Sequence, residues 1–229
     1  MYDFITHTWN PLAGACPHNC SYCSTGKMGR RYKALKEKYT GPPRLDQTQM
    51  NNLGKKNFIF VAAQNDLFAE TVPDEIITKI LQHCNEHQAN RYFFQTRNTR
   101  RLHEFRNQLP EQSTVCTTIE TDEWHPRMST APPPMARALF LKNIDHPKFV
   151  TIEPIMKFKL EGLVTLIGMT RAEQVNIGAD SGKNNLPEPT PVEIWKLVKE
   201  LEKFTKVKIK DNLKRLYPWT TTGNSTQKR

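Results

Sequence analysis

Three cysteines near the amino terminus are the residues with the clearest chemical potential in this sequence. Cys16, Cys20 and Cys23 lie within eight residues, in the run Cys-Pro-His-Asn-Cys-Ser-Tyr-Cys. Three thiolates on one short loop can bind three irons of a cubane 4Fe–4S cluster and leave the fourth iron open. An open metal position is typical of a catalytic site, because a substrate or cofactor can bind there.

The same cysteines also fit other kinds of protein. With a histidine such as His7 or His18 they would form a Cys3His zinc site, as in a zinc-stabilised nucleic-acid-binding protein. A cluster protein without catalysis, acting as a partner or sensor, is a third interpretation. Structural zinc sites usually combine two ligand pairs, and this sequence offers one group of ligands. The sequence therefore favours a cluster over zinc.

Composition narrows the class of protein. The chain has 229 residues, of which 37% are hydrophobic and 24% charged, and these shares argue against disorder, collagen-like repeats and a coiled coil. No apolar run approaches the roughly 18 residues that a membrane span needs, and Met1 is not followed by a basic and apolar leader. We therefore expect a cytoplasmic protein that does not contact a membrane, with reduced cysteines.

Positive charge is concentrated in two segments of the chain. The net charge is +10, and residues 27–56 hold nine basic and two acidic residues. Residues 196–229 hold ten basic and three acidic residues. Such segments suit a polyanionic partner, so DNA or RNA is a candidate. The alternative is a lysine-rich surface that only contacts solvent.

Runs of apolar and β-branched residues predict strands that alternate with helices. Two helices are expected to begin at capping boxes, one at Thr71 with Asp74 and one at Thr190 with Glu193. This alternation indicates a parallel α/β barrel or a doubly wound sheet. The seven expected strands are Phe4–Trp9, Asn57–Ala63, Arg91–Gln95, Thr114–Ile119, Lys148–Ile152, Gln174–Ile177 and Lys206–Ile209.

Polar residues follow nearly every expected strand, and this placement favours the barrel. Ligands of α/β barrels are held at the carboxyl ends of the strands. The alternative is that loops generally begin with polar residues. The strand-end residues are Gln64, Asn65, Asp66, Thr96, Arg97, Glu120, Glu153, Asp180, Ser181, Lys210, Asp211 and Asn212.

The cysteine run resembles the cluster-binding loop of the radical S-adenosylmethionine (SAM) superfamily, including an aromatic residue, Tyr22, before the third cysteine. The resemblance implies a partial parallel (β/α) barrel of six or seven strands. It also implies a 4Fe–4S cluster whose open iron binds SAM. In that superfamily, reductive cleavage of SAM gives a 5′-deoxyadenosyl radical that abstracts hydrogen from the substrate.

A narrower resemblance covers most of the chain. Short motifs recur in the order typical of a phage-associated radical SAM family whose substrate is unassigned, with a distant likeness to spore photoproduct lyases. We therefore expect one domain over residues 1–215, with a basic insertion at about 24–56 and a polar tail at 216–229. The motifs are Thr8-Trp9-Asn10-Pro11, Asn65-Asp66-Leu67-Phe68, Thr96-Arg97, Glu153-Pro154 and Gly178-Ala179-Asp180-Ser181-Gly182.

The resemblance also assigns roles to residues outside the cysteine loop. The superfamily often binds the SAM amino group with a Gly-Gly-Glu-like turn after the second strand, and here Gln64, Asn65 and Asp66 stand in that place. Further SAM-binding candidates are Tyr22, Glu120, Glu153, Gly178, Asp180 and Ser181. For the two glutamates, an outward salt bridge is the competing interpretation. For the glycine-containing loop it is an ordinary tight turn.

Catalysis and substrate binding complete the set of expected roles. Cys116 and Glu120 share a side-chain parity that would point them into the barrel, where Cys116 could return a hydrogen atom to a product radical or simply fill the core. Arg97, Arg100 and Arg101 could grip phosphate or begin a solvated helix. We expect a modification or repair lyase acting on DNA or RNA, with flavodoxin or ferredoxin as its electron donor.

Overall fold

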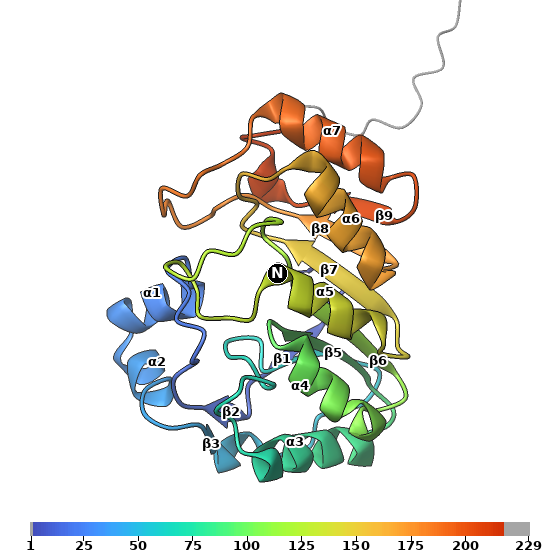
Figure 1. Cartoon of the computed structure of the whole chain (residues 1–229). Helices are drawn as coiled ribbons and strands as arrows, with labels where there is room; N and C mark the ends of the chain where they lie inside the picture. The colour runs from blue at the N-terminus through green and yellow to red at the C-terminus, as the bar shows by residue number, and fades with distance from the viewer. Residues whose placement is uncertain (1, 218–229) are drawn as a thin grey trace, which may run out of the picture.

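Seven short runs of apolar and β-branched residues pair into one parallel sheet in the order β1-β4-β5-β6-β7-β8-β9 (Figure 1). The computed structural model describes residues 2–217. All seven predicted strands are present within it, with small shifts at their ends. They are β1 (His7–Trp9), β4 (Phe58–Val61), β5 (Arg91–Thr96), β6 (Ser113–Thr118), β7 (Lys148–Ile152), β8 (Gln174–Ile177) and β9 (Lys206–Ile209).

Helices connect the successive strands and cover the outer face of this sheet (Figure 1). Neighbouring helices also pack on one another, α4 on α5, α5 on α6 and α6 on α7. The result is an α/β fold whose parallel sheet curves into an open partial barrel, as predicted. The helices are α3 (Asp74–Glu86), α4 (Thr99–Glu104), α5 (Pro134–Lys142), α6 (Leu160–Thr170) and α7 (Pro191–Leu201).

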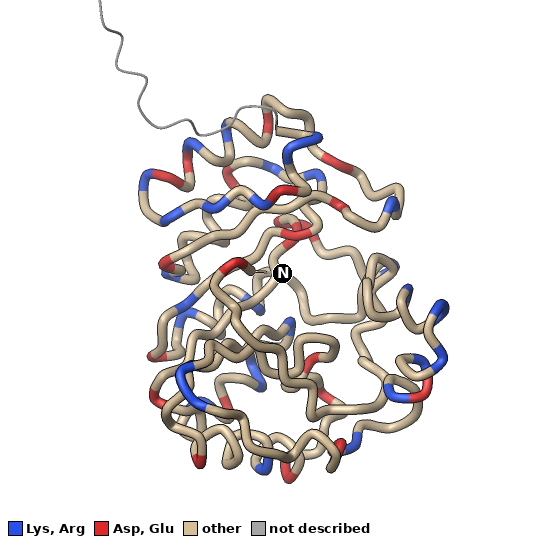
Figure 2. The backbone as a smooth tube through the Cα atoms, turned by 180° about the vertical axis from the view of Figure 1, so that it is seen from behind, with Lys and Arg blue, Asp and Glu red and all other residues tan. Residues whose placement is uncertain are grey.

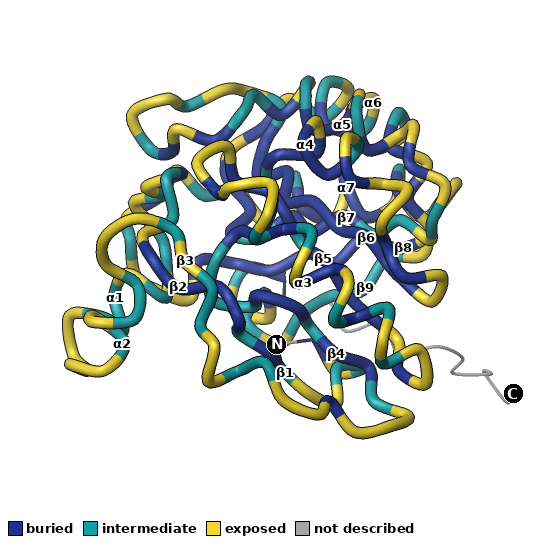
Figure 3. The backbone as a smooth tube through the Cα atoms, turned by 90° about the horizontal axis from the view of Figure 1, so that it is seen from below, coloured by how far each residue is buried: buried dark blue, intermediate teal, exposed yellow. Residues whose placement is uncertain are grey.

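Side chains alternate between the two faces of the sheet, and each face has its own core. In β4, Ile59 and Val61 belong to the large cluster beneath the helices. Phe58 and Phe60 belong to a second, smaller cluster on the inner face. The middle strands β4 to β8 are mostly buried by both cores, as Figure 3 shows, whereas β9 is partly exposed. Burial on both faces explains the continuous apolar run of β4.

Aromatic residues from the start of the chain fill the inner face. Tyr2 and Phe4 stack with ring centroids 5.2 Å apart, and each lies close to the ring of Phe93 on β5. The Tyr2 hydroxyl is hydrogen-bonded to Gln95 at 2.9 Å and to Thr151 at 2.6 Å. The barrel interior is therefore a packed core below its polar mouth.

The basic segment at 24–56 lies beside the sheet and carries little core. Helices α1 (Ser24–Arg31) and α2 (Lys33–Lys38) contain no buried residue. The sequence did not predict β2 (Leu12–Ala13) and β3 (Arg44–Leu45). These two strands pair antiparallel and link this segment to the residues before the cysteines. Apart from residues 216 and 217, the predicted polar tail lies outside the described residues. The 3-10 turns are η1 (Gln47–Gln49), η2 (Arg106–Gln108) and η3 (Asp211–Leu213).

The two predicted capping boxes have different outcomes. Thr190 caps α7 by accepting a hydrogen bond from the Glu193 amide, and the Glu193 carboxylate returns one. At α3 the prediction is wrong, because the N-cap is Pro73 and no side chain caps the helix. A proline at N-cap moves the first turn beyond the reach of the Thr71 hydroxyl. No described helix has the length and apolar character to cross a membrane.

Candidate active site

The three cysteines lie on the loop that leaves β2 and enters α1. All three are free thiols with intermediate exposure. Cys23 is the N-cap of α1, and its sulfur accepts a hydrogen bond from the Gly26 amide at 3.4 Å. A helix N-terminus favours negative charge, so this position suits a thiolate.

A segment far along the chain braces the cysteine loop from one side. The Thr130 amide donates to the His18 carbonyl at 2.9 Å, and the Ser21 amide donates to the Met128 carbonyl at 2.8 Å. The Ser129 hydroxyl lies 3.1 Å from the Cys20 sulfur. Residues 128–130 therefore hold the loop by its backbone and by one of its sulfurs.

A buried pair of side chains holds the loop from the other side. His18 Nε2 lies 2.8 Å from the Asp66 carboxylate, and both side chains are less than 10% exposed. Asp66 also accepts hydrogen bonds from the Thr96 hydroxyl at 2.6 Å and from the Arg97 amide at 2.8 Å. Burial alone would raise the pKa of Asp66, but His18 and these donors lower it. Asp66 is thus an anion that joins the cysteine loop to the ends of β4 and β5.

The two residues before Asp66 also contact the start of the loop. The Asn65 amide group donates to the Gly14 carbonyl at 2.9 Å, and the Gln64 backbone amide donates to Asn10 at 3.1 Å. The turn at residues 64–66, which the resemblance assigned to SAM, therefore supports the loop in this structure. Its contact with SAM stays a prediction.

The surroundings of Cys16 disfavour its charged form. Burial, followed by the Asp66 carboxylate, raises the pKa of the Cys16 thiol to about 12. Within the described residues no lysine or arginine figures among the main influences on this thiol. A positively charged metal centre would supply the missing compensation, because coordination deprotonates a thiol.

Glu120 lies at the end of β6 and is enclosed by charged and polar partners. It accepts hydrogen bonds from Arg97 at 2.8 Å, from Arg137 at 2.8 Å and from the Tyr22 hydroxyl at 2.7 Å. Its side chain is 3% exposed, and that of Arg137 is 4% exposed. Burial alone would raise the pKa of Glu120, but Arg137 and Arg97 hold it well below the ordinary value. Glu120 is therefore a carboxylate at neutral pH and anchors Tyr22, a neighbour of Cys23.

The three arginines predicted to bind substrate do not lie together. Arg97 faces the site and places its guanidinium 5.6 Å from the centroid of the Tyr22 ring. Arg100 pairs with Glu70 and Glu104 on the surface. Arg101 is buried and donates to the carbonyls of residues 69 and 70, which makes it a support for the start of α3. Only Arg97 of the three reaches the cysteine loop.

A second polar group lies at the ends of β7, β8 and β9. Glu153 binds Lys210 and accepts a hydrogen bond from Asn212 at 2.6 Å. Asn212 also donates to the Ser181 hydroxyl at 2.7 Å. A Cβ atom at Gly178 would lie 2.6 Å from the Glu153 carboxylate, so any side chain here would displace that carboxylate. The structure thus brings together Glu153, Gly178 and Ser181, as the sequence predicted for strand ends.

The loop after β8 crosses toward the helix that follows the cysteines. Asp180 accepts hydrogen bonds from the backbone amides of Gly182 and Asn184. Burial alone would raise the pKa of Asp180, and these amides lower it. Lys27 of α1 donates to the Gly182 carbonyl at 2.6 Å. Asp180 therefore shapes a loop that reaches the cysteine side of the mouth.

Cys116 lies below this polar mouth, in the apolar cluster of the inner face. Its sulfur is fully buried and lies 3.9 Å from the Tyr2 hydroxyl. Burial raises the pKa of the Cys116 thiol to about 12. The predicted inward orientation agrees with these contacts, and the return of hydrogen by this thiol stays a prediction.

Some residues of the site were not predicted. Arg137 on α5 and Ser129 in the preceding loop follow no strand, so the strand-end pattern cannot find them. The signal for Arg137 is an arginine inside the apolar run Met-Ala-Arg-Ala-Leu-Phe-Leu, a residue type that is rarely buried without a partner. No comparable signal marks Ser129.

Solved structures define the class of fold. The chain is similar to a double mutant of spore photoproduct lyase with bound S-adenosylmethionine (AdoMet) and dinucleoside spore photoproduct, with a TM-score of 0.60 and 11% identity over 88% of this chain and 75% of that chain. The chain is also similar to the same lyase complexed with dinucleoside spore photoproduct. The TM-score is 0.58 and the identity 10%, over 87% of this chain and 74% of that chain. At this identity the likeness shows the fold alone. The chain therefore has a radical SAM-like partial barrel.

The sequence itself places the chain in a family. Residues 2–195 match the model described as "Protein of unknown function (DUF5131)", and the chain belongs to this family. No curated protein matches the sequence.

Proposed function

We propose that this protein is a radical SAM enzyme that binds a 4Fe–4S cluster through Cys16, Cys20 and Cys23. The observation that carries the proposal is the position of these free thiols, on a braced loop beside the polar ends of a seven-stranded parallel sheet. Ligands of such barrels bind at that end of the strands. The likeness in fold to spore photoproduct lyase supports the same assignment.

The residues of the loop fit a cluster in their chemistry. Three thiols from one short segment leave one iron of a cubane without a protein ligand. His18 Nε2 is bonded to Asp66 at 2.8 Å, which ties the histidine inside the loop to the ends of the strands. The chain offers one group of ligands, whereas structural zinc sites usually combine two ligand pairs. This favours a three-cysteine donor set over a Cys3His zinc site, the alternative in which the protein only binds nucleic acid.

The opposite side of the mouth fits the cofactor that would bind the open iron. The Asn212 carbonyl oxygen is buried and accepts no hydrogen bond from the described residues. It lies beside Gly178 and the Glu153 carboxylate. These acceptors suit the hydroxyl and amino donors of a nucleoside, and the absence of a side chain at Gly178 leaves room for both acceptors beside the backbone. We assign Glu153, Gly178, Ser181 and Asn212 to SAM binding.

When bound, the cluster and SAM together supply a 5′-deoxyadenosyl radical that abstracts hydrogen from a substrate. The chain's own residues position these groups and exclude water. Asp66 and residues 128–130 fix the loop, and Glu120 fixes Tyr22 next to Cys23. An electron donor such as flavodoxin or ferredoxin would approach the exposed side of the cysteine loop.

DNA or RNA is the substrate class that we favour. Basic residues line α1 and α2, next to the cysteine loop (Figure 2). A hollow of about 360 Å³ beside the loop is lined by Pro17, Asn98 and Trp124 among others. Trp124 is 55% exposed, and an exposed aromatic ring is a common platform on which nucleic-acid bases stack.

Anaerobic reconstitution with iron and sulfide tests the proposal. We expect about four irons and four sulfides per chain, and formation of 5′-deoxyadenosine from SAM after reduction. Replacing Cys16, Cys20 or Cys23 with alanine should abolish both results. Cys84→Ala is the matched control, because Cys84 is a buried residue of α3 and belongs to the large apolar core.

Two outcomes would refute the proposal. A colourless protein that retains zinc and no iron would establish the nucleic-acid-binding alternative. A protein that binds the cluster and leaves SAM intact would indicate a partner or sensor.

A further inference from the structure

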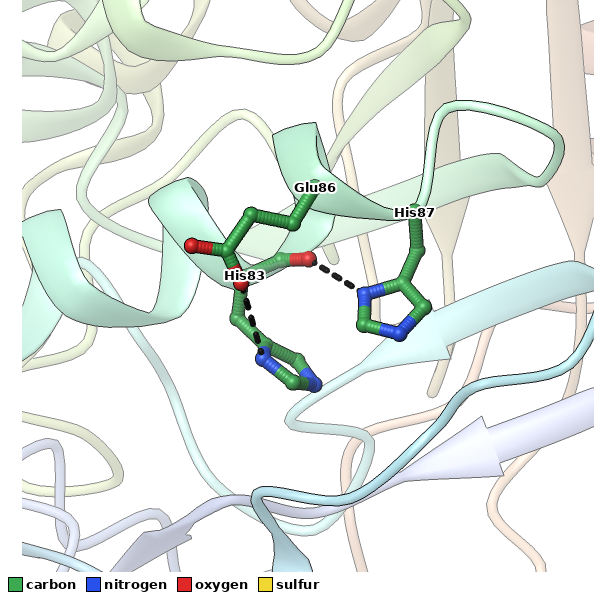
Figure 4. Close-up of side chains that lie close together, drawn as sticks. All are labelled: His83, Glu86 and His87. Carbon is green, nitrogen blue, oxygen red and sulfur yellow. Dashed lines mark hydrogen bonds and ion pairs between the residues drawn. The ribbon is translucent and has the colours of Figure 1, made fainter.

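A second group of metal-ligand side chains lies at the end of α3, outside the cysteine site. His83, Glu86 and His87 are separated by three and four residues, so they share one side of the helix (Figure 4). One ligand atom from each side chain lies within 4.8 Å of the other two. The two imidazole rings are 4.5 Å apart between centroids. We propose that these three residues form a binding site for a divalent transition-metal ion, with zinc as its best match.

Each histidine has one ring nitrogen bonded to a carbonyl. His87 Nδ1 lies 2.9 Å from the His83 carbonyl, so Nε2 is the nitrogen of His87 left for a metal. His83 Nε2 lies 2.9 Å from the Asn51 carbonyl, which leaves Nδ1 on the side of Glu86, 3.6 Å from its carboxylate. The ring of His83 also packs against Trp9, with centroids 5.2 Å apart, and its side chain is 12% exposed. Metal-bound histidines usually donate their other nitrogen to a carbonyl in this manner, which fixes the tautomer.

The electrostatics of the helix end favour a cation at this position. Glu86 is the last residue of a helix of 13 residues, where the helix dipole is negative and a carboxylate is unfavourable. The side chain of Glu86 is 71% exposed, and its ion-pair partner among the described residues is His83. A bound cation would turn this unfavourable placement into a favourable one.

The donor set identifies the class of metal. Two imidazole nitrogens and one carboxylate suit zinc and its neighbours in the first transition row, and they do not suit calcium or magnesium. Three protein ligands leave a position for water. Because Asn51 belongs to the basic 24–56 segment and His87 begins the turn into β5, the ion would fasten that segment to the main fold.

Titration with Co²⁺ and Zn²⁺ tests this site, provided that the cysteine loop cannot bind the metal. The full chain carrying Cys16→Ser, Cys20→Ser and Cys23→Ser meets this condition. We expect one metal per chain, with a Co²⁺ spectrum that lacks thiolate charge-transfer bands. The same titration on the unsubstituted chain with alkylated thiols gives a second measurement, in case the triple variant does not fold.

Substitutions on the same helix identify the ligands. Glu86→Gln and His87→Gln should each weaken binding by more than about tenfold, because loss of even an outer partner commonly costs that much. Glu75→Gln removes the same charge from an exposed position near the start of α3 and should leave binding unchanged. Equal affinity in all three variants, or no metal bound in either background, would overturn the proposal. Neither result depends on the cluster at the other site.

Discussion

At the scale of single residues, the site is organised by buried carboxylates that hold other side chains in place. Glu120 binds two arginines and Tyr22, and Asp66 binds His18 and two groups from the end of β5. Both carboxylates have pKa values below their ordinary range despite burial. Because each has several partners, its removal should affect the fold and the site together.

Glu120→Gln should lower the free energy of unfolding by about 3 kcal/mol, because it leaves Arg137 buried without a counter-charge. Glu123→Gln is the matched control, since Glu123 is exposed and pairs with Lys159 on the surface. Urea unfolding of both variants at neutral pH measures the difference. A loss no larger than that of the control would contradict the assigned role of Glu120.

The same residue predicts a pH dependence. The pKa of Glu120 in the folded state is lower than its ordinary value of 4.5, so its ion pairs stabilise the fold fully above that pH. This contribution is lost as the pH falls below about 4.5 toward the folded pKa. The stability difference between the native chain and Glu120→Gln should therefore shrink on acidification. A stability difference that stays constant from pH 7 to pH 3 would contradict this role of the Glu120 carboxylate.

His18→Ala should destabilise the fold by about 1 to 3 kcal/mol, because it removes one of the two hydrogen bonds to a buried carboxylate oxygen of Asp66 and leaves the Arg97 amide as its partner. If the pair positions the cysteine loop, iron uptake during reconstitution should also fall. His7→Ala, at an exposed position of β1, is the control for both measurements. Normal iron uptake by a folded His18→Ala chain would remove the positioning role.

At the scale of secondary-structure elements, the caps give a direct comparison between two similar sequence signals. Thr190→Ala should lower the free energy of unfolding by about 1 kcal/mol, because it removes the side-chain hydrogen bond to the first turn of α7. Thr71→Ala should leave the free energy of unfolding nearly unchanged, because no side chain caps α3. Thermal unfolding of the two variants checks this contrast, and equal losses would show that the cap of α7 contributes little.

The sequence predicts the strands well because most of them are short buried runs with a regular face preference, and the partly exposed β9 alternates lysine with apolar residues. β7, β8 and β9 have the predicted bounds, and the polar residues that follow strands meet at one edge of the sheet. The capping box predicted at Thr71 is wrong because a sequence similar to that at Thr190 has a different backbone conformation there. The sequence does not predict Ser129 because it contacts Cys20 and His18, which lie more than 100 residues earlier in the chain. It does not predict Arg137 because the contacts of this residue depend on the packing of α5. Spacing along the chain carries no information about such contacts.

At the scale of the whole molecule, the charge distribution predicts how a nucleic acid would bind. The net charge is +10, and basic residues of α1 and α2 lie next to the cysteine loop. Affinity for DNA or RNA should fall steeply as salt increases, because counterions are released on binding. Replacing Arg30, Arg31 and Lys33 with alanine should reduce the slope of log affinity against log salt by about 2 to 3.

Filter binding or fluorescence anisotropy over a salt series measures this slope. Lys79→Ala, Lys142→Ala and Arg171→Ala, which remove the same charge from exposed positions outside both basic segments, serve as the matched control. An unchanged slope in the first set would place the contact elsewhere. Binding that ignores salt would favour a small metabolite or a peptide.

The open sheet has a consequence for the behaviour of the protein in concentrated solution. β9 pairs with β8 on one side and forms an edge of the sheet, where unpaired backbone groups can recruit a strand from another molecule. Lys206, exposed at the start of β9, discourages such pairing because two edges of this kind repel each other. Lys208 is paired with Asp3 at 3.0 Å, so protection of this edge depends on a single exposed lysine.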